Sequence, residues 1–339
     1  MRSPDSAVKA LLFVPGCAPD ASFVSADRRA LGQLARLTEM VPAGGRGRLA
    51  FVAGVVGAVR ARPSGAVLWF ATPGYGLATA AACRLGRIPL LVVSGGADVA
   101  SCPEIGFGDA RLPWRRAVAR WILEGAAGVW AFSDAAAREV AIVAPRASVR
   151  VVPPAVDTAF FRPQPVPRER LVATTCAAIT PVTIAQKGLD RLIEAARLIP
   201  EAGFVITGAP GAASAVSRFV AAAPPNVTFA GHVSREALRA LYARATVVAQ
   251  LSRHEGFGVA AVEAAAMGCR ILTTRLPVFA EVLGSLPDTV PLDATAEAIA
   301  AAIRAALAAP MPADRWAELD RRYGGAVREA AWAAWLAAL

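Results

Sequence analysis

Residues 252–268 read SRHEGFGVAAVEAAAMG: a polar cluster, two glycines, and an alanine-rich run with helical spacing. Gly256 and Gly258 allow backbone N–H groups to approach a ligand closely. A helix that begins near Gly258 would direct the positive end of its dipole at the same place, which suits an anion such as a diphosphate. Two carboxylates frame this turn, because Glu255 lies in the loop before it and Glu263 lies more than one turn into the helix.

This stretch resembles the E-x7-E signature of the retaining "group 1" glycosyltransferases (family 4), which have the GT-B fold. The likeness includes E-G-F-G between the two acids and E-A-x-A-x-G from the second acid onward. The alternative interpretation is a buried loop-to-helix turn whose acids act only as N-terminal caps, since short motifs also occur by chance. The resemblance continues from residue 94 to residue 284, with four segments in the order of the family.

Apolar strands alternate with helical segments along the chain, which predicts βαβ units and parallel sheets, an α/β fold. In the GT-B fold two Rossmann-like domains face each other across a cleft, and the resemblance implies this architecture here. We expect residues 1–165 to form the acceptor-side domain and residues 166–312 the domain that binds the nucleotide sugar. Residues 313–339 contain two helices, and the resemblance implies that the last one crosses back onto the first domain.

Composition favours an ordinary globular protein. The 339 residues are 55% hydrophobic, which is ample for two cores. No apolar run reaches the roughly 18 to 20 residues of a membrane span, and the run near Met1 is too short for a signal peptide. Five scattered cysteines without a C-x-x-C pair predict reduced thiols in a cytoplasmic protein, not disulfides or a zinc site.

The net charge of +10 comes mostly from the first half of the chain. Such a surface attracts nucleic acid, anionic lipid or an acidic acceptor, and the sequence lacks a nucleic-acid-binding motif, so we expect no nucleic acid partner. Residues 111–123 (RLPWRRAVARWIL) predict an amphipathic helix with helically spaced arginines and two tryptophans. Related enzymes with lipid-linked acceptors dock on anionic bilayers through such a helix, which implies peripheral contact with the inner face of the membrane. The alternative is an ordinary surface helix with a core stripe.

Lys187 stands out because only two residues, Lys9 and Lys187, are lysines. In the family a basic residue follows the first strand of the second domain, and K-G then opens a helix; the pair grips the donor diphosphate. Lys187 and Gly188 match the K-G, whereas Thr180 or its neighbours stand where the family has arginine, which implies that Thr180 contacts the donor. A lysine there would stabilise the departing nucleotide. The alternative is a solvent-exposed lysine before a helix.

Three further residues are weaker candidates. Asp98, in a segment similar to G-G-x-D-V of one branch of the family, is predicted to contact the donor sugar where other members have a histidine. A turn or helix-cap role for Asp98 is the alternative. His232 and Val233 close a segment resembling N-V-x-F-x-G-x-V, whose backbone contacts the nucleotide base in the family.

The resemblance implies transfer of a hexose from a nucleoside diphosphate sugar to an acceptor hydroxyl, with retention of anomeric configuration. The acceptor would be a glycan, a lipid-linked sugar or a small molecule. Glu255 would then bind the donor sugar, and Glu263 the ribose hydroxyls. Backbone groups of the loop would also contact the donor; its residues are Gly256, Phe257, Gly258 and Val259.

Other activities fit less well. The sequence has no D-x-D, so we expect neither a required metal nor another cofactor. The absence of a P-loop and of a strand-coupled G-x-G-x-x-G argues against an NTPase and a dehydrogenase. Two alternatives stay open: a non-catalytic GT-B subunit that scaffolds an active partner, and a sugar-nucleotide epimerase.

Overall fold

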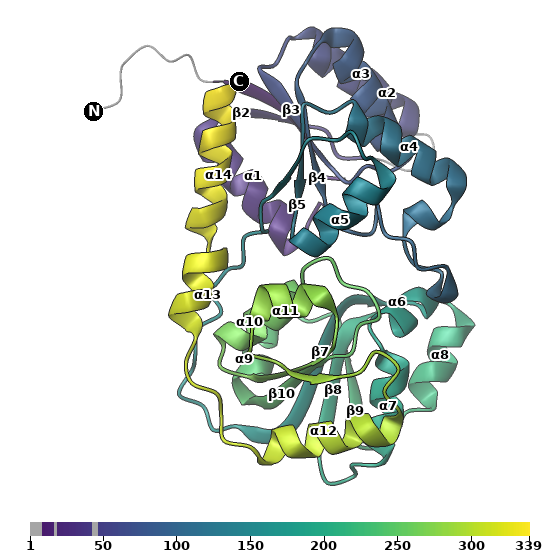
Figure 1. The fold of residues 1–339 in the computed structure, drawn as a ribbon, viewed down its shortest axis with the longest axis vertical. Helices are drawn as coiled ribbons and strands as arrows, with labels where there is room; N and C mark the ends of the chain where they lie inside the picture. Colours follow the sequence, from purple (N-terminus) through teal and green to yellow (C-terminus); the bar gives the residue numbers. More distant parts are fainter. Residues whose placement is uncertain (1–8, 17–18, 43–46) are drawn as a thin grey trace. The chain divides into compact units, whose positions relative to one another are not determined.

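A computed structural model describes residues 9–16, 19–42 and 47–339 (Figure 1). The chain divides into two compact units. Unit 1 comprises Met1–Pro103, Phe107–Ala155 and Gly325–Leu339, and unit 2 comprises Glu104–Gly106 and Val156–Gly324. Cys17 lies outside the described residues.

The unit boundaries fall near the expected ones but do not coincide with them. The sequence placed the first boundary after residue 165 and the return to the first domain at residue 313, whereas the units divide after Ala155 and after Gly324. Hydrogen bonds within unit 2 account for the difference. The Val156 N–H donates to the Tyr323 carbonyl at 2.8 Å, and the Trp316 indole donates to the Thr158 carbonyl at 2.7 Å.

Unit 1 is built on a six-stranded parallel sheet of order β2-β1-β3-β4-β5-β6. The strands are β1 (Ala10–Val14), β2 (Arg36–Glu39), β3 (Gly65–Trp69), β4 (Leu90–Ser94), β5 (Gly128–Ala131) and β6 (Val149–Val151). The helices are α1 (Ser22–Leu34), α2 (Gly47–Arg60), α3 (Tyr75–Gly86), α4 (Pro113–Glu124), α5 (Asp134–Val143) and α14 (Gly325–Ala338), with 3-10 turns at Pro103–Ile105 and Asp109–Arg111.

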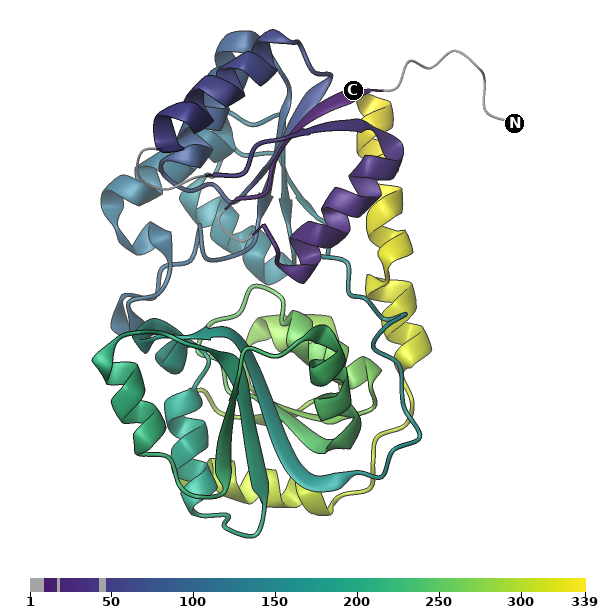
Figure 2. The ribbon, with the colours of Figure 1, turned by 180° about the vertical axis from the view of Figure 1, so that it is seen from behind.

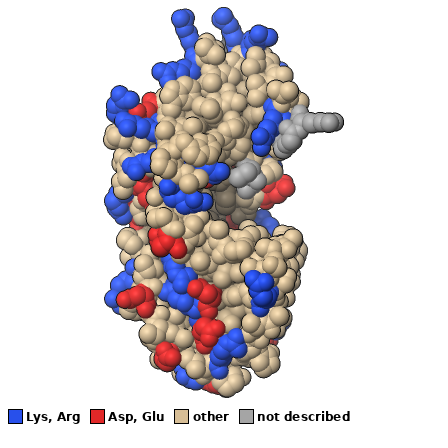
Figure 3. Space-filling view, turned by 90° about the vertical axis from the view of Figure 1, so that its right-hand side faces the viewer, with Lys and Arg blue, Asp and Glu red and all other residues tan. Residues whose placement is uncertain are grey.

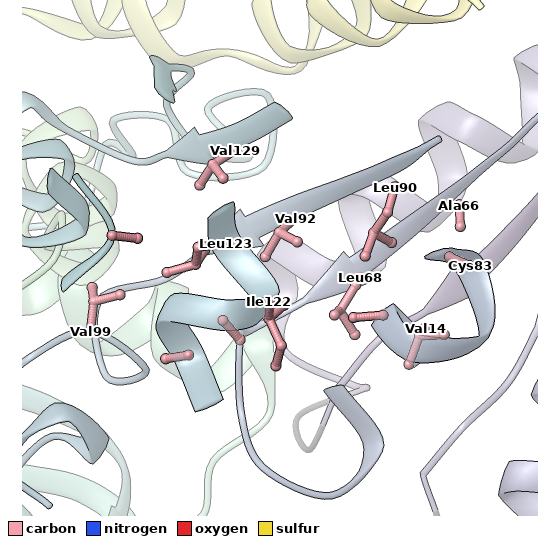
Figure 4. Close-up of a cluster of buried hydrophobic side chains, with 14 of the residues drawn as sticks. Val14, Ala66, Leu68, Cys83, Leu90, Val92, Val99, Ile122, Leu123 and Val129 are labelled. Carbon is pink, nitrogen blue, oxygen red and sulfur yellow. The ribbon is translucent and has the colours of Figure 1, made fainter. Parts of the chain in front are cut away.

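The sheet of unit 1 is covered on both faces (Figures 1 and 2). Helices α2 to α5 cover one face, where Leu68 and Val92 of the central strands gather around Ile122 of α4 (Figure 4). The central strands β3 and β4 are buried along their whole length, as continuous apolar runs in a parallel sheet must be. Helices α1 and α14 cover the other face, where the rings of Trp130 and Trp332 lie 4.2 Å apart.

The last helix is fastened to unit 1 by a buried ion pair. Arg328 of α14 donates two hydrogen bonds of 2.8 Å to the carboxylate of Asp27 on α1, and Trp332 donates a third of 2.8 Å to the same group. Both charged side chains are almost fully buried, at 2% and 1% exposure. The predicted return of the last helix to the first domain is therefore confirmed for α14.

Unit 2 is built on a second six-stranded parallel sheet of order β12-β11-β10-β7-β8-β9. Its strands are β7 (Glu169–Ile179), β8 (Gly203–Pro210), β9 (Val227–Gly231), β10 (Ala245–Gln250), β11 (Arg270–Thr274) and β12 (Asp288–Val290). Its helices are α6 (Pro181–Gln186), α7 (Leu189–Arg197), α8 (Ser214–Ala221), α9 (Arg235–Arg244), α10 (Val259–Ala266), α11 (Pro277–Leu283), α12 (Ala296–Ala308) and α13 (Trp316–Tyr323).

The strand order of unit 2 reverses between two neighbouring strands. From β7 the chain proceeds outward through β8 and β9, then returns to the middle and proceeds in the other direction through β10, β11 and β12. In open α/β sheets ligands bind beyond the carboxyl ends of the strands at such a reversal. The loops that follow Ile179 and Gln250 are therefore where a ligand site is expected.

Candidate donor-binding site

The loop after β7 places Lys187 at this point. Thr180 begins α6 with a capping box, because the Thr183 N–H donates to the Thr180 hydroxyl at 3.1 Å and the Thr180 N–H donates to the Thr183 hydroxyl at 2.7 Å. Lys187 ends this one-and-a-half-turn helix, and Gly188 starts α7. The role that the structure gives Thr180 is thus a helix cap, and its predicted contact with the donor stays a prediction.

Gly188 is required by its backbone and by its surroundings. Its φ is +65°, and a Cβ added there would lie 2.1 Å from the Leu251 carbonyl oxygen. Residues with a side chain rarely adopt a positive φ, and a Cβ so close to an oxygen would clash with it. The absence of a side chain allows the corner after α6 to approach the end of β10.

The loop after β10 ends in the glycine turn that the sequence predicted. Gly258 has φ +90° and precedes α10, and a Cβ there would lie 2.9 Å from the Phe279 ring. Phe257 is buried, with its ring 5.1 Å from that of Tyr323. The N–H groups of Ala261 and Val262 donate to the Gly258 carbonyl at 2.9 and 3.2 Å, whereas the helix has no acceptor for the N–H groups of Val259 and Ala260. A rigid turn therefore presents backbone donors at the carboxyl edge of the sheet.

Lys187 and Glu255 form an ion pair that joins the two loops. The Lys187 Nζ lies 2.6 Å from the Glu255 Oε2, and the Ser252 hydroxyl lies 3.3 Å from the same oxygen. The side chains are 20% and 13% exposed, so the pair is largely shielded from water but still accessible. A cation and a carboxylate held together at a strand reversal suit a ligand that carries both phosphate and hydroxyl groups.

Glu263 lies in α10, 7% exposed. Burial raises its pKa to about 8, against a smaller lowering effect of Arg235 and a further raising effect of Asp157. Among the described residues none donates a hydrogen bond to this carboxylate. A buried carboxylate with free acceptor capacity is suited to hold hydroxyl groups of a ligand.

The structure gives Asp98 the role of a loop organiser in unit 1. Asp98 is 1% exposed, and its carboxylate accepts hydrogen bonds from the Ala71 N–H at 3.0 Å, the Ser94 hydroxyl at 3.1 Å and the Gly96 N–H at 3.2 Å. Burial raises its pKa, and these hydrogen bonds oppose the rise. This geometry favours the alternative of a turn residue, and contact with a sugar stays a prediction without support here.

The other predicted residues are placed as follows. His232 and Val233 follow β9, two strands away from β7 in the sheet, and their predicted role in binding the nucleotide base stays a prediction. In the described ranges no group of three or more His, Cys, Asp and Glu side chains is arranged to hold a metal. The expectation that no metal is required stays a prediction.

Sequence reasoning missed three residues that connect the loops: Gln186, Asp190 and Arg253. Gln186 and Asp190 lie on either side of the K-G motif, and Arg253 precedes Glu255 by two positions. Their proximity to motif residues was the only signal, because pairing between distant segments is not visible in one sequence.

Similar solved structures define the class of the fold. The structure titled Anabaena Alr3699/HepE in complex with UDP and glucose superimposes with a TM-score of 0.76 and 18% identity, over 98% of this chain and 100% of that one. Sucrose-phosphate synthase from Thermosynechococcus elongatus gives a TM-score of 0.76 at 15% identity, over 96% and 97% of the two chains. The fold is GT-B, with two Rossmann-like units, as the sequence predicted.

The sequence of unit 2 also has a match. Residues 178–323 match the family model described as glycosyl transferases group 1. This match confirms the resemblance noted in residues 252–268.

Curated relatives match a part of the chain. A GDP-mannose-dependent alpha-(1-6)-phosphatidylinositol monomannoside mannosyltransferase from Mycobacterium tuberculosis is 30% identical over 55% of this chain and 51% of its own length. A D-inositol 3-phosphate glycosyltransferase from Mycolicibacterium vanbaalenii is 34% identical over 42% of this chain and 35% of its own length. The matched region thus spans about half of the first relative and about a third of the second.

Proposed function

We propose that this protein is a retaining glycosyltransferase that moves a hexose from a nucleoside diphosphate sugar to an acceptor hydroxyl. The observation that carries the proposal is the ion pair between Lys187 and Glu255, held 2.6 Å apart where the strand order of a group 1 domain reverses.

Each group has a distinct task in this proposal. The Lys187 ammonium binds the diphosphate and stabilises the negative charge that grows as the nucleotide departs. Glu255, released from the lysine when the donor enters, accepts hydrogen bonds from hydroxyl groups of the sugar. Glu263 accepts hydrogen bonds from the ribose, and the N–H groups at the start of α10 face the phosphates or the sugar.

In a single displacement, retention requires that the acceptor attack from the side on which the leaving group departs. In the proposed reaction the bond between the anomeric carbon and the diphosphate oxygen breaks, and a bond from that carbon to the acceptor oxygen forms. The acceptor proton passes to a phosphate oxygen of the leaving group. We propose that no metal is required, because the ammonium of Lys187 and backbone N–H groups supply the positive potential.

The relatives suggest donors to test. One is named as GDP-mannose-dependent, and one structural neighbour is a complex with UDP and glucose. We therefore expect GDP or UDP to raise the melting temperature without Mg²⁺, since a ligand at a hundred times its Kd adds about 2.7 kcal/mol of stability.

The test uses the whole chain, a panel of UDP, GDP, ADP and dTDP, and three variants. Lys187→Ala and Glu263→Gln should each reduce or abolish the shift. Glu255→Gln should keep the fold and the shift but abolish transfer, because Glu255 is assigned to the sugar. Glu201→Gln, which changes an exposed carboxylate paired with Arg304, is the matched control. The absence of any shift with the unaltered protein would contradict the proposal and favour a non-catalytic scaffold.

We also propose that unit 1 contacts an anionic membrane surface through residues 111–123. On α4, Trp114 and Trp121 are 57% and 40% exposed, although large aromatic side chains are mostly buried in globular proteins. Leu85 at the end of α3 and Ile142 at the end of α5 are 88% and 67% exposed.

Arginines surround these apolar side chains. Arg84 stacks on Trp121 at 5.3 Å, and Arg115 stacks on Trp114 at 5.1 Å. On the side shown in Figure 3, basic side chains predominate over unit 1, whereas acidic and basic ones are mixed over unit 2. Exposed aromatic rings among cations suit the headgroup region of an anionic bilayer. Within the described residues no helix is both long and apolar enough to cross a bilayer.

Co-sedimentation with vesicles of phosphatidylcholine and phosphatidylglycerol tests this contact. We expect binding at low salt that weakens as salt screens the charges, and weaker binding by Trp114→Ala and by Arg116→Ala. Vesicles of phosphatidylcholine alone serve as the control. No binding to anionic vesicles at low salt would eliminate the membrane proposal and leave an ordinary surface helix.

A further inference from the structure

Arg253, two residues before Glu255, links the two loops that carry the ion pair. Its guanidinium donates hydrogen bonds of 3.0 and 2.7 Å to the two carboxylate oxygens of Asp190, in the first turn of α7. The same guanidinium donates to the Ala185 carbonyl near the end of α6. One side chain of the β10 loop therefore binds the elements on both sides of Lys187.

The backbone strengthens this connection. The Arg253 N–H donates to the Gln186 carbonyl at 2.7 Å, and the Gln186 side-chain amide donates to the His254 carbonyl at 3.1 Å. Gln186 is 6% exposed, so its amide is fixed in place. The two residues before Glu255 are thus held to the corner that ends in Lys187.

Lys187 and Glu255 need such support because their side chains are flexible. A lysine has four carbons between its backbone and its charge, and holding such a side chain in one conformation costs conformational entropy. The 2.6 Å contact therefore depends on how the two loops are held. A planar guanidinium bound to both oxygens of a carboxylate supplies direction as well as attraction, which a lysine at that position would not.

We propose that Arg253 and Asp190 are positioning residues that hold Lys187 and Glu255 at the separation a nucleoside diphosphate requires. The inference rests on the proposed function of the same site. Arg253 and Asp190 act through the loops, and neither needs to touch the ligand.

Isothermal titration calorimetry measures two affinities for each variant. One is for the nucleoside diphosphate that the unaltered protein binds, UDP or GDP, and the other is for the corresponding nucleoside monophosphate. Because Lys187 serves the diphosphate, loss of its position should reduce diphosphate affinity about 10- to 100-fold and leave monophosphate affinity nearly unchanged. We expect this loss of preference in Arg253→Ala and in Asp190→Asn, which differs from the native residue by one atom and keeps its shape.

The matched control is Arg244→Ala. Arg244 also binds a carboxylate through two nitrogens, with distances of 2.6 and 2.9 Å to Glu169, but at the amino ends of the strands of unit 2. The Arg244→Ala substitution should lower the melting temperature without changing the preference for the diphosphate over the monophosphate. Adding Lys187→Ala to Arg253→Ala should weaken diphosphate binding no further than Lys187→Ala alone, since both changes remove the same contact.

The outcomes separate the two proposals. If folded Arg253→Ala and Asp190→Asn both keep the diphosphate preference of the unaltered protein, the positioning role is wrong and the proposed function stands. If Arg244→Ala loses the preference as well, the effect reports general stability, and the positioning role is again wrong. If the unaltered protein binds no nucleoside diphosphate, the proposed function fails, and the inference fails with it.

Discussion

Glu263 is a carboxylate almost removed from water, and its ionisation is therefore linked to folding. Its pKa is about 8 in the folded chain against 4.5 as the ordinary value, mainly because of burial. The folded state thus holds the proton more tightly than the unfolded state. The stabilisation from protonated Glu263 is complete below about pH 4.5 and is lost as the pH rises through about 8.

Glu263→Gln should abolish this dependence. We expect the free energy of unfolding of the variant to equal that of the unaltered protein near pH 5 and to exceed it at pH 8 to 9. The difference should grow by at most about 1.4 kcal/mol per pH unit between pH 5 and 8. Above about pH 8, where the native group is ionised, the nucleotide affinity of the variant should be about tenfold lower, because a neutral amide replaces a charged acceptor. Urea unfolding between pH 5 and 9 measures the effect. Parallel stability curves for the two proteins would show that Glu263 does not titrate in this range.

At the scale of secondary structure elements, α14 depends on one buried ion pair. Arg328 and Asp27 are 2% and 1% exposed, and Arg328 also donates to the Val152 carbonyl at 2.9 Å. Removing one partner of such a pair leaves a charge in an apolar environment, which costs about 3–5 kcal/mol. The loss in the free energy of unfolding is much smaller when both charges are removed together.

Arg328→Met should accordingly lower the free energy of unfolding of unit 1 by about 3–5 kcal/mol, as measured by urea unfolding. The double variant Asp27→Asn/Arg328→Met should be more stable than Arg328→Met alone. The asparagine carbonyl still accepts the Trp332 indole hydrogen bond, now 2.8 Å long, and the isolated charge is gone. A double variant that is less stable than the single one would contradict this account.

The elements themselves were largely predictable because burial leaves a periodic pattern. The alternation of apolar strands with helical segments and the glycine turn at Gly258 indicated a parallel α/β fold. The short edge strand β2 was not predicted, since Arg36–Glu39 is mostly exposed and lacks an apolar run. Thr180 was assigned to the donor by resemblance, whereas its capping box with Thr183 is a local hydrogen-bond pattern that the spacing of the two threonines permits.

The candidate site was predictable only in part. Lys187 and Glu255 were recognised separately, because each lies in a short motif of its own. Their direct contact, and the link through Arg253 and Asp190, join segments more than sixty positions apart. Such contacts depend on strand order, and local sequence does not encode which strands become neighbours.

At the scale of the whole molecule, the candidate donor groups lie in one continuous part of the chain. Lys187, Glu255 and Glu263 all belong to unit 2, which comprises Val156–Gly324 and the three residues Glu104–Gly106. The match to the group 1 family, residues 178–323, falls within the same interval. Unit 1, by contrast, is assembled from segments at both ends of the chain and includes α14.

A fragment of residues 156–324 should therefore fold and bind the nucleoside diphosphate that the full chain binds, with a Kd within about tenfold, since every contact assigned to the diphosphate and ribose lies within it. A fragment of residues 1–155 lacks α14, so the apolar sheet face that α14 covers is exposed and Asp27 loses its hydrogen bonds to Arg328 and Trp332; this fragment should be unstable. Circular dichroism and titration calorimetry on both fragments measure these outcomes, with Lys187→Ala in the longer fragment as the control. If the 156–324 fragment folds but does not bind the nucleotide, groups of unit 1 are required for donor binding, and the assignment of the donor site to unit 2 alone is wrong.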